Sequence, residues 1–328
     1  MTGGARASAY GRVATELALY GDLRLRELVD GGEPIGRGIG GRTVRLEVGG
    51  TPVFVKQVRL TDLERRAENV HSTANVFGLP AFCQYGYGTP AFGAWRELAV
   101  HVMTTNWVLA GDHEGFPLMY HWRVLPGPRQ PLPEELADVD GAVAAWGGGS
   151  GVRRRIEGLR DSSASLTLFL EHVPQNLHDW LRVQVAAGGD ATARALAMVE
   201  EELEAGTSFM NARGLLHFDA HFENILTDGR RLFFADFGLA LSSRFELGQD
   251  EREFFALHRA YDRCYTVTHL VNWLVAELFG HAADQRRAYV RALAEGEGRG
   301  GCATGRRGHP RPARADRRSD GRLLACVP

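Results

Sequence analysis

Three oxygen-bearing side chains in the second half of the chain could do chemistry together: Asp219, Asn224 and Asp236. Two short apolar stretches, 224–227 and 231–235, flank an Asp-Gly pair, which is typical of a β-hairpin turn. Because polar residues stand just before the first stretch and just after the second, the hairpin would bring the three side chains to one end. Carboxylate and amide oxygens are the ligands that hard cations prefer, and a carboxylate can also orient a reacting hydroxyl.

A second candidate is Lys56, the only lysine in the chain. It lies in the run 52–58, which is predicted to be a strand. Phe54, Lys56 and Val58 would share one face of this strand, and Val53 and Val55 the other. An unpaired charge among apolar neighbours is costly. Since arginine fills every other Lys/Arg position, the single lysine indicates a role that needs a compact ammonium and not a planar guanidinium.

A glycine-rich segment precedes this strand. Gly36, Gly38 and Gly41 form a GxGxxG pattern just before the predicted strand 44–48, where backbone could approach a phosphate without obstruction by side chains. With 40 glycines in the chain the pattern alone is weak. Together with the lysine and the oxygen ligands, however, it completes the parts that phosphoryl transfer from ATP requires.

The motifs resemble those of the protein-kinase-like superfamily. The segment 217–224 reads HxDxxxxN, Asp236-Phe237-Gly238 reads DFG, and residues 53–56, within the predicted strand, read VFVK. The resemblance covers residues 31–295 and implies an α+β, bilobal protein-kinase-like fold with a small antiparallel β-rich N-lobe and a mainly helical C-lobe. The expected division is an N-terminal helical extension (1–30), the N-lobe (31–172), the C-lobe (173–294) and a disordered Arg/Gly/Pro-rich tail (295–328).

The same resemblance implies roles for individual residues, with ATP and Mg²⁺ as cofactors. Asp219 would be the catalytic base, Asn224 and Asp236 would hold Mg²⁺, and Lys56 would bind the ATP phosphates beneath the glycine loop. Glu97 would be the ion-pair partner of Lys56, and it lies on a predicted helix whose apolar stripe is Trp95, Leu98, Val102 and Leu109. The backbone of Glu171 and Val173 would bind adenine. His221 would lie near the γ-phosphate.

Two features favour a small hydroxyl-bearing molecule as the acceptor. His221 follows Asp219 by two positions, as in aminoglycoside and choline kinases, and no APE-like motif follows between residues 239 and 280. The DFG motif and the glycine loop look more like those of protein kinases, so a Ser/Thr protein kinase is the alternative. A nucleotide-binding scaffold without turnover is a further one.

Two other interpretations of these residues remain open. His217, Asp219 and His221 alternate along the chain and could converge on a transition metal if the segment were extended. Such a site would leave Asn224 and Lys56 unexplained. Alternatively, the polar residues are ordinary turn and cap residues around a hairpin.

Bulk properties narrow the partners and the location. The formal net charge of −2 gives no excess of positive charge to recommend nucleic acid as a partner. No apolar run reaches the length of a membrane span, and the N-terminus lacks a signal-peptide pattern, so a cytoplasmic location is expected. The segment 126–163, with several prolines, a glycine run and the basic run 153–155, is interpreted as a solvated surface insertion.

Overall fold

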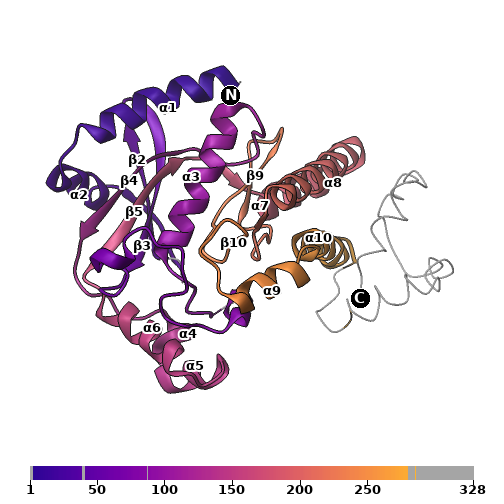
Figure 1. Cartoon of the computed structure of the whole chain (residues 1–328). Coiled ribbons are helices and arrows are strands. Elements are labelled where there is room, and N and C mark those ends of the chain that lie inside the picture. The colour runs from indigo at the N-terminus through magenta and orange to yellow at the C-terminus, as the bar shows by residue number, and fades with distance from the viewer. Residues whose placement is uncertain (1–2, 39–40, 87, 280–284, 286–328) are drawn as a thin grey trace.

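The computed structural model describes residues 3–38, 41–86, 88–279 and 285, and the described chain is a mixed α+β protein (Figure 1). Its strands are β1 (Glu33–Gly38), β2 (Gly41–Val48), β3 (Thr51–Leu60), β4 (Met119–Pro126), β5 (Ala164–Glu171), β6 (Gln175–Asn176), β7 (Leu215–Leu216), β8 (Ile225–Thr227), β9 (Leu232–Phe234) and β10 (Leu241–Ser242). Its helices are α1 (Gly3–Ala18), α2 (Asp22–Asp30), α3 (Ala94–Ala110), α4 (Glu134–Ala137), α5 (Val139–Ala145), α6 (Ser150–Asp161), α7 (Leu177–Ala187), α8 (Gly189–Ala212), α9 (Gln249–Leu257) and α10 (Tyr261–Phe279).

The first five strands form one antiparallel sheet in the order β1-β2-β3-β5-β4. The predicted hairpin between β2 and β3 is present, with Val48 paired to Thr51. Gly49 and Gly50 form its turn with φ angles of 54° and 75°. Two consecutive positive φ angles match the right-handed twist of the strands, and glycine reaches them without steric cost.

Helices cover both faces of this sheet. Helices α1 and α2 pack on one face, where Val53 and Val55 join their apolar residues in one buried cluster. Helix α3 lies on the opposite face, together with Phe54 and Val58 of β3. The alternation predicted for β3 is therefore confirmed, and Lys56 points toward α3. The helical structure predicted within residues 1–30 is present as α1 and α2, which contribute apolar residues to the buried cluster on this face of the sheet.

The predicted helix around Glu97 is present as α3, although its buried face differs from the expected one. Trp95 and Leu98 are buried as predicted, but Val102 and Leu109 are each 40% exposed. Val100 and Trp107 are buried instead. The helix packs against both the sheet and the helical region, so few of its residues are exposed to solvent. A stripe deduced from helical periodicity assumes one buried face, and that assumption fails here.

The segment 127–162, which we call the cap, is not the solvated insertion that was expected. It contains α4, α5 and α6. Leu136 and Ile156 of the cap share an apolar core with Phe77 of the segment 61–93. Arg155, from the basic run, is only 3% exposed. The cap is therefore a packed unit that shares its core with segment 61–93.

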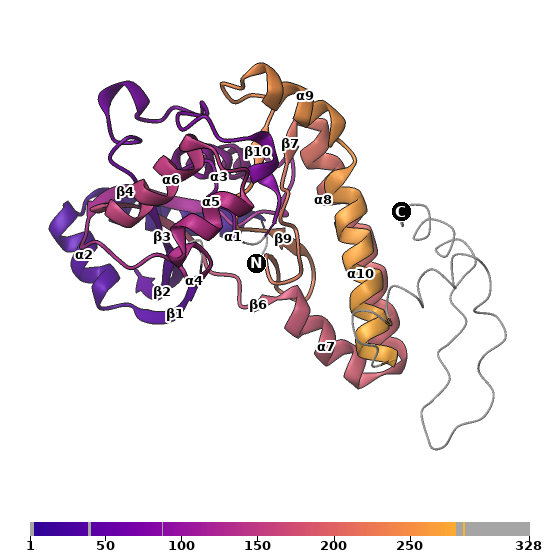
Figure 2. The same cartoon turned by 90° about the horizontal axis from the view of Figure 1, so that it is seen from below.

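The rest of the described chain forms a mainly helical region with its own core. Helices α8 and α10 lie side by side, with α7 near one end of the pair (Figure 2). The β8–β9 hairpin predicted at residues 224–235 is present, with Ile225 paired to Phe234. The expected disordered tail, 295–328, lies outside the described residues. In the part of the chain that is described, no helix has the length and apolar character needed to cross a membrane.

Candidate functional site

Lys56 makes two ion pairs where the sheet meets the helical region, one with a buried carboxylate and one with a carboxylate whose side chain is 40% exposed. Its Nζ lies 2.7 Å from Oε1 of Glu97 on α3 and 2.8 Å from Oδ1 of Asp236, just after β9. Lys56 is 4% exposed and Glu97 3%. The structure thus joins three residues that are far apart in the sequence, and it pairs Lys56 with the predicted glutamate and not with the nearer Glu64.

The pKa values follow from this grouping. Burial alone would lower the pKa of Lys56, but the carboxylates of Asp236 and Glu97 raise it above its ordinary value. Burial alone would raise the pKa of Asp236, but the Lys56 ammonium and the Gly238 N–H hold it at about 2. Lys56 is therefore charged, and Asp236 is an ionised carboxylate at neutral pH.

Asp219 and Asn224 lie next to this group. Nδ2 of Asn224 donates 3.0 Å hydrogen bonds to the backbone oxygen and to Oδ2 of Asp219. Burial raises the pKa of Asp219, and the nearby Asp236 raises it too, while His221, with Nε2 3.7 Å from Oδ1, lowers it. The predicted meeting of Asp219, Asn224 and Asp236 at one end of the hairpin is observed.

The transition-metal interpretation is wrong. His217 is fully buried, with its Nε2 3.0 Å from the carbonyl oxygen of Ala235 and its Nδ1 accepting from the N–H of Asp219. Both ring nitrogens are thus used internally, and His217 does not converge with His221. Among the described residues, no group of three His, Cys, Asp or Glu side chains could hold a metal ion.

Backbone conformation at the site is fixed by Asp262, a residue that the sequence analysis missed. Phe218 and Asp236 have positive φ angles of 63° and 60°, which are uncommon for residues other than glycine. The Asp262 carboxylate accepts from the N–H groups of His217 and Phe218 at 2.6 and 2.9 Å. It therefore holds the turn that carries Asp219. A lone aspartate at the start of the apolar helix α10 was the available signal.

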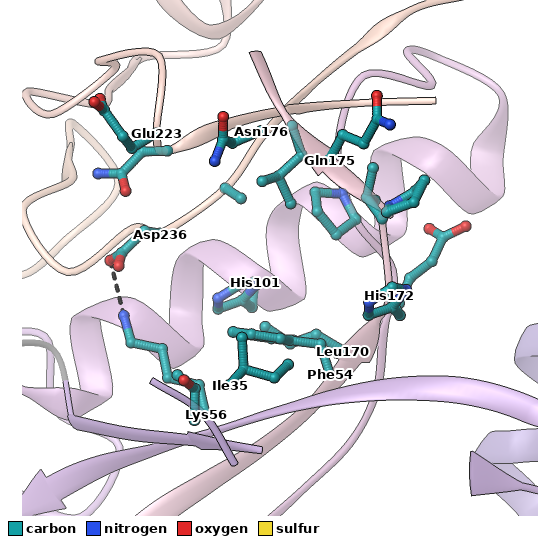
Figure 3. A pocket seen from close by; sticks show the side chains of 18 of the residues that line it. Ile35, Phe54, Lys56, His101, Leu170, His172, Gln175, Asn176, Glu223 and Asp236 are labelled. Carbon is teal, nitrogen blue, oxygen red and sulfur yellow. Dashed lines mark hydrogen bonds and ion pairs between the residues drawn. The ribbon is translucent and has the colours of Figure 1, made fainter. Parts of the chain in front are cut away.

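A cavity of about 340 Å³ opens beside Lys56 (Figure 3). Lys56, Asn224 and Asp236 line one end of it. The backbone segment from Glu171 to Val173, which was predicted to bind adenine, lines the other. This segment connects β5 to the helical region, so the cavity lies between the sheet and the helices.

The Glu171 side chain has a structural role that was not predicted. Arg6 of α1 donates to both of its oxygens, from Nε at 3.0 Å and from Nη2 at 2.6 Å, and the N–H of Leu118 donates to it at 3.1 Å. Arg6 is 3% exposed. This buried bidentate pair fixes the end of β5. It uses only the side chain of Glu171, so it does not involve the backbone groups of Glu171 and Val173 that were predicted to bind adenine.

The glycine pattern lies in the first hairpin of the sheet. Gly36 and Gly38 belong to β1, and Gly41 begins β2 and lines the cavity. Gly41 has a φ of 122°, and a Cβ there would lie 1.9 Å from the carbonyl oxygen of Gln57. Glycine is therefore required at position 41 by the packing of β2 on β3, whether or not a phosphate binds.

His101, one turn after Glu97 on α3, also lines the cavity. It is 1% exposed, and its two ring nitrogens have no hydrogen-bond partner among the described residues. Burial, reinforced by the charge of Lys56, lowers the pKa of His101 to about 3, so the ring is neutral in the folded protein. Its ring stands edge-on to Phe237, with the ring centroids 5.0 Å apart.

Replacing His101 with leucine is expected to stabilise the protein, because an unsatisfied buried polar group costs about 1–3 kcal/mol. The gain should grow at acid pH. The unfolded state binds a proton below its ordinary pKa of about 6.5 and the folded state does not until about 3, so the wild-type residue loses stability as pH falls through that range. At pH 5 the linkage adds roughly 2 kcal/mol. Urea unfolding at pH 8 and pH 5 measures both parts, and an equal gain at the two pH values would contradict the assignment.

The chain was also compared with known proteins. No protein-family model matches it. No curated protein matches it either.

Proposed function

We propose that this chain is a Mg²⁺-dependent phosphotransferase that moves the γ-phosphoryl group of ATP to a hydroxyl acceptor, on a bilobal protein-kinase-like fold. The observation that carries the proposal is the contact of the buried Lys56 ammonium with Glu97 and Asp236 at the edge of a cavity, beside the Asp219–Asn224 pair. A charged ammonium, two oxygen ligands and a further carboxylate are the groups that this reaction requires.

The cavity offers ATP two kinds of contact. Adenine would lie against the backbone from Glu171 to Val173, next to the side chains of Ile35 and Leu170 on the sheet side of the cavity. The phosphates would then extend toward Lys56, whose ammonium gives up part of its contact with Asp236 to bind them. Glu97 keeps the Lys56 side chain in position while this happens, because it is buried and contacts the ammonium from helix α3.

The residues present fit a magnesium ion held together with the nucleotide. Mg²⁺ is commonly bound by one or two protein oxygen ligands plus substrate phosphates, so a cluster of three acids is not needed. Asp236 is ionised, and the oxygen of the Asn224 amide is not used in its two bonds to Asp219. Asp236 and Asn224 would hold the ion, which supplies positive charge to the phosphate oxygens.

Asp219 would receive the acceptor. Its carboxylate accepts the acceptor's O–H, orients the oxygen toward the γ-phosphorus and takes up the proton as the new bond forms. Asn224 holds this carboxylate through Oδ2, which leaves Oδ1 for the acceptor. The raised pKa of Asp219 makes it a stronger base than an exposed aspartate.

The proposal is tested by Mg²⁺-dependent binding and consumption of ATP. Asp236→Asn should raise the Mg²⁺ concentration for half-maximal turnover by a factor of 10 to 100, the size of effect typical for disturbing a metal site. Asp228→Asn is a matched control, since Asp228 lies in the β8–β9 turn, where its carboxylate accepts from the backbone N–H groups of Arg230 and Arg231.

The outcomes separate the alternatives. An unchanged Mg²⁺ requirement in Asp236→Asn would contradict the role given to Asp236. Tight ATP binding without any turnover would favour a nucleotide-binding scaffold. Phosphate found on an added protein such as casein, and on no small alcohol, would favour a protein kinase.

A further inference from the structure

A second cavity, of about 290 Å³, lies on the other side of Lys56 and its partners. The catalytic candidates Asp219 and His221 line it, as do Glu97 and Gly238. Asn224 and Asp236 line the first cavity instead. The Asp219–Asn224 hydrogen bond therefore stands between the two cavities, with the proposed base on the side away from the nucleotide.

Strand β3 runs along both cavities. Phe54, Lys56 and Val58 share one face of it; Phe54 lines the first cavity and Val58 the second, with Lys56 between them. The separation from Phe54 to Val58 is four residues, or roughly 13 Å along a strand. A group bound over Phe54 and another bound over Val58 would thus meet near Lys56.

Most of the wall of the second cavity is apolar. The cap contributes Pro133, Leu136 and Leu159, and the helical region contributes Leu239 and Tyr265. The loop that ends at α3 adds Thr89, Pro90 and Ala91. A ligand there would meet carbon on most sides and a carboxylate at one end.

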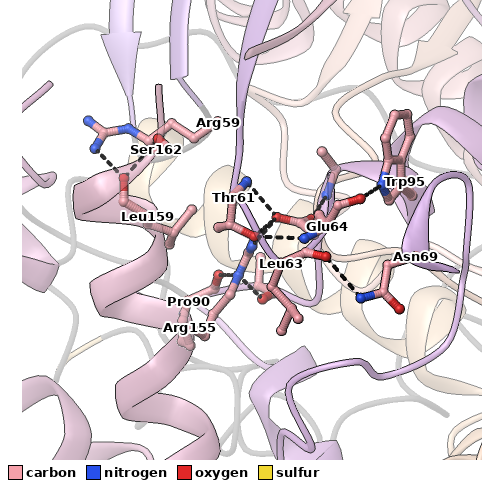
Figure 4. A network of polar contacts seen from close by, with 12 residues as sticks. Arg59, Thr61, Leu63, Glu64, Asn69, Pro90, Trp95, Arg155, Leu159 and Ser162 are labelled. Carbon is pink, nitrogen blue, oxygen red and sulfur yellow. Dashed lines mark hydrogen bonds and ion pairs between the residues drawn. The ribbon is translucent and has the colours of Figure 1, made fainter. Parts of the chain in front are cut away.

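The two arginines of this wall are already engaged. Arg155 donates to Glu64 at 2.7 Å and to the carbonyl oxygens of Pro90 and Ala91 at 3.1 Å, and Figure 4 shows this network. Arg59 donates to three carbonyl oxygens, those of Gln130, Pro131 and Leu159. Their charged ends thus hold the walls together. Glu97 is paired with Lys56, and Nδ1 of His221 lies 2.8 Å from Glu223, so Asp219 is the carboxylate left to face a ligand.

Glu64 makes the wall rigid. Besides Arg155, it accepts from the hydroxyl of Thr61 at 2.7 Å and from the N–H of Ala94, the first residue of α3, at 2.9 Å. Glu64 and Arg155 are 1% and 3% exposed. The end of β3, the start of α3 and the cap are therefore tied to one buried carboxylate, so the cavity is preformed.

We propose that this second cavity is the acceptor site, and that its acceptor is a small uncharged alcohol with an apolar ring or chain. The inference rests on the proposed function. The hydroxyl would lie at Asp219 and the apolar part against Val58, Leu239 and the cap. An anionic acceptor is disfavoured, because it would meet the Asp219 carboxylate while both arginines are occupied.

The reaction balances with ATP as the only other reactant. A lone pair of the alcohol oxygen forms the new bond to the γ-phosphorus. The bond from that phosphorus to the β,γ-bridging oxygen breaks, and its electron pair leaves with ADP. The hydroxyl proton passes to Asp219 and then to solvent, so the products are a phosphate monoester, ADP and one proton.

The test measures ADP release from Mg²⁺-ATP with 2-phenylethanol, glucose, glycerol phosphate or casein as the added acceptor. With wild-type protein, 2-phenylethanol should accelerate ADP release by about tenfold or more, the discrimination that a fitted apolar pocket provides. Val58→Trp fills the cavity and should abolish that acceleration while the ATP Kd stays within about twofold, since Val58 does not line the nucleotide cavity. Val183→Trp, at a position 63% exposed on α7, is the matched control and should behave as wild type.

Tyr265→Ala is a second variant in case Val58→Trp folds poorly, and it should raise the KM for 2-phenylethanol without changing the ATP Kd. Preference for glucose, glycerol phosphate or casein, no acceleration by 2-phenylethanol, or acceleration that survives in both cavity variants, would overturn the acceptor assignment. Failure of the wild-type protein to bind Mg²⁺-ATP at all would instead overturn the proposed function, so the two failures are distinguishable.

Discussion

Lys56→Met is expected to lower kcat by about 100- to 1,000-fold, the loss seen when one preorganised charged or hydrogen-bonding group is removed from a reaction centre. It should also destabilise the fold by about 3–5 kcal/mol, because removing one partner of a buried ion pair leaves the other uncompensated. Lys56→Met removes the partner of both Glu97 and Asp236, but the Asp236 side chain is 40% exposed and stays solvated. The buried group left uncompensated is therefore Glu97, which is 3% exposed and has its carboxylate 2.7 Å from the Lys56 ammonium. Steady-state kinetics and urea unfolding measure the two effects separately.

The double variant Lys56→Met, Glu97→Leu is the control that separates chemistry from folding. Replacing both members of a buried pair by apolar residues is often neutral in stability. The double variant should therefore regain most of the lost free energy of unfolding and none of the lost turnover. Recovery of turnover along with stability would show that Lys56 acts only by holding the fold.

Asp219→Asn is expected to lower kcat by about 100- to 10,000-fold, the range for loss of a general base. The ATP Kd should change by less than about twofold, because the proposed contact of Asp219 is with the acceptor. Asparagine can still accept the hydrogen bond from Asn224, so the fold should be retained. Kinetics and calorimetric titration with ATP give the two numbers, and a parallel loss of ATP affinity would count against this role.

The pH profile gives an independent reading of the same group. Turnover requires the unprotonated Asp219 carboxylate, so it falls as pH drops through the folded-state pKa. Since burial raises that pKa, the fall should set in at a higher pH than an exposed aspartate would give. In Asp219→Asn the residual turnover should lack this limb.

The contact between Lys56 and Glu97 could be predicted because both residues lie on elements with a clear period. The alternation in β3 fixes the face of Lys56, and α3 is long enough for its helical pattern to be recognised. The β8–β9 hairpin was predictable for the same reason, with an Asp-Gly turn between two apolar runs. Asp219, Asn224 and Asp236 come together as a direct result of that hairpin.

The buried arginines could not be found in this way. Arg6 pairs with Glu171 and Arg155 pairs with Glu64, at separations of 165 and 91 residues. Local patterns say nothing about a partner so far away, and an arginine in a basic run is normally a solvated one. The cap was missed because its helices α4 and α5 have four and seven residues, too few turns to show a period against the prolines and glycines around them.

Gly41 shows that a motif residue can owe its identity to two independent demands. The close approach of Gln57 excludes any side chain at this position, so its replacement would disturb the pairing of β2 with β3 even in a protein with no nucleotide to bind. Over evolutionary time, a descendant that had lost phosphate transfer would be free to change Asp219, yet its fold would still select for glycine at 41. Retention of this glycine therefore carries little information about activity, whereas retention of the lone lysine beside it carries much more.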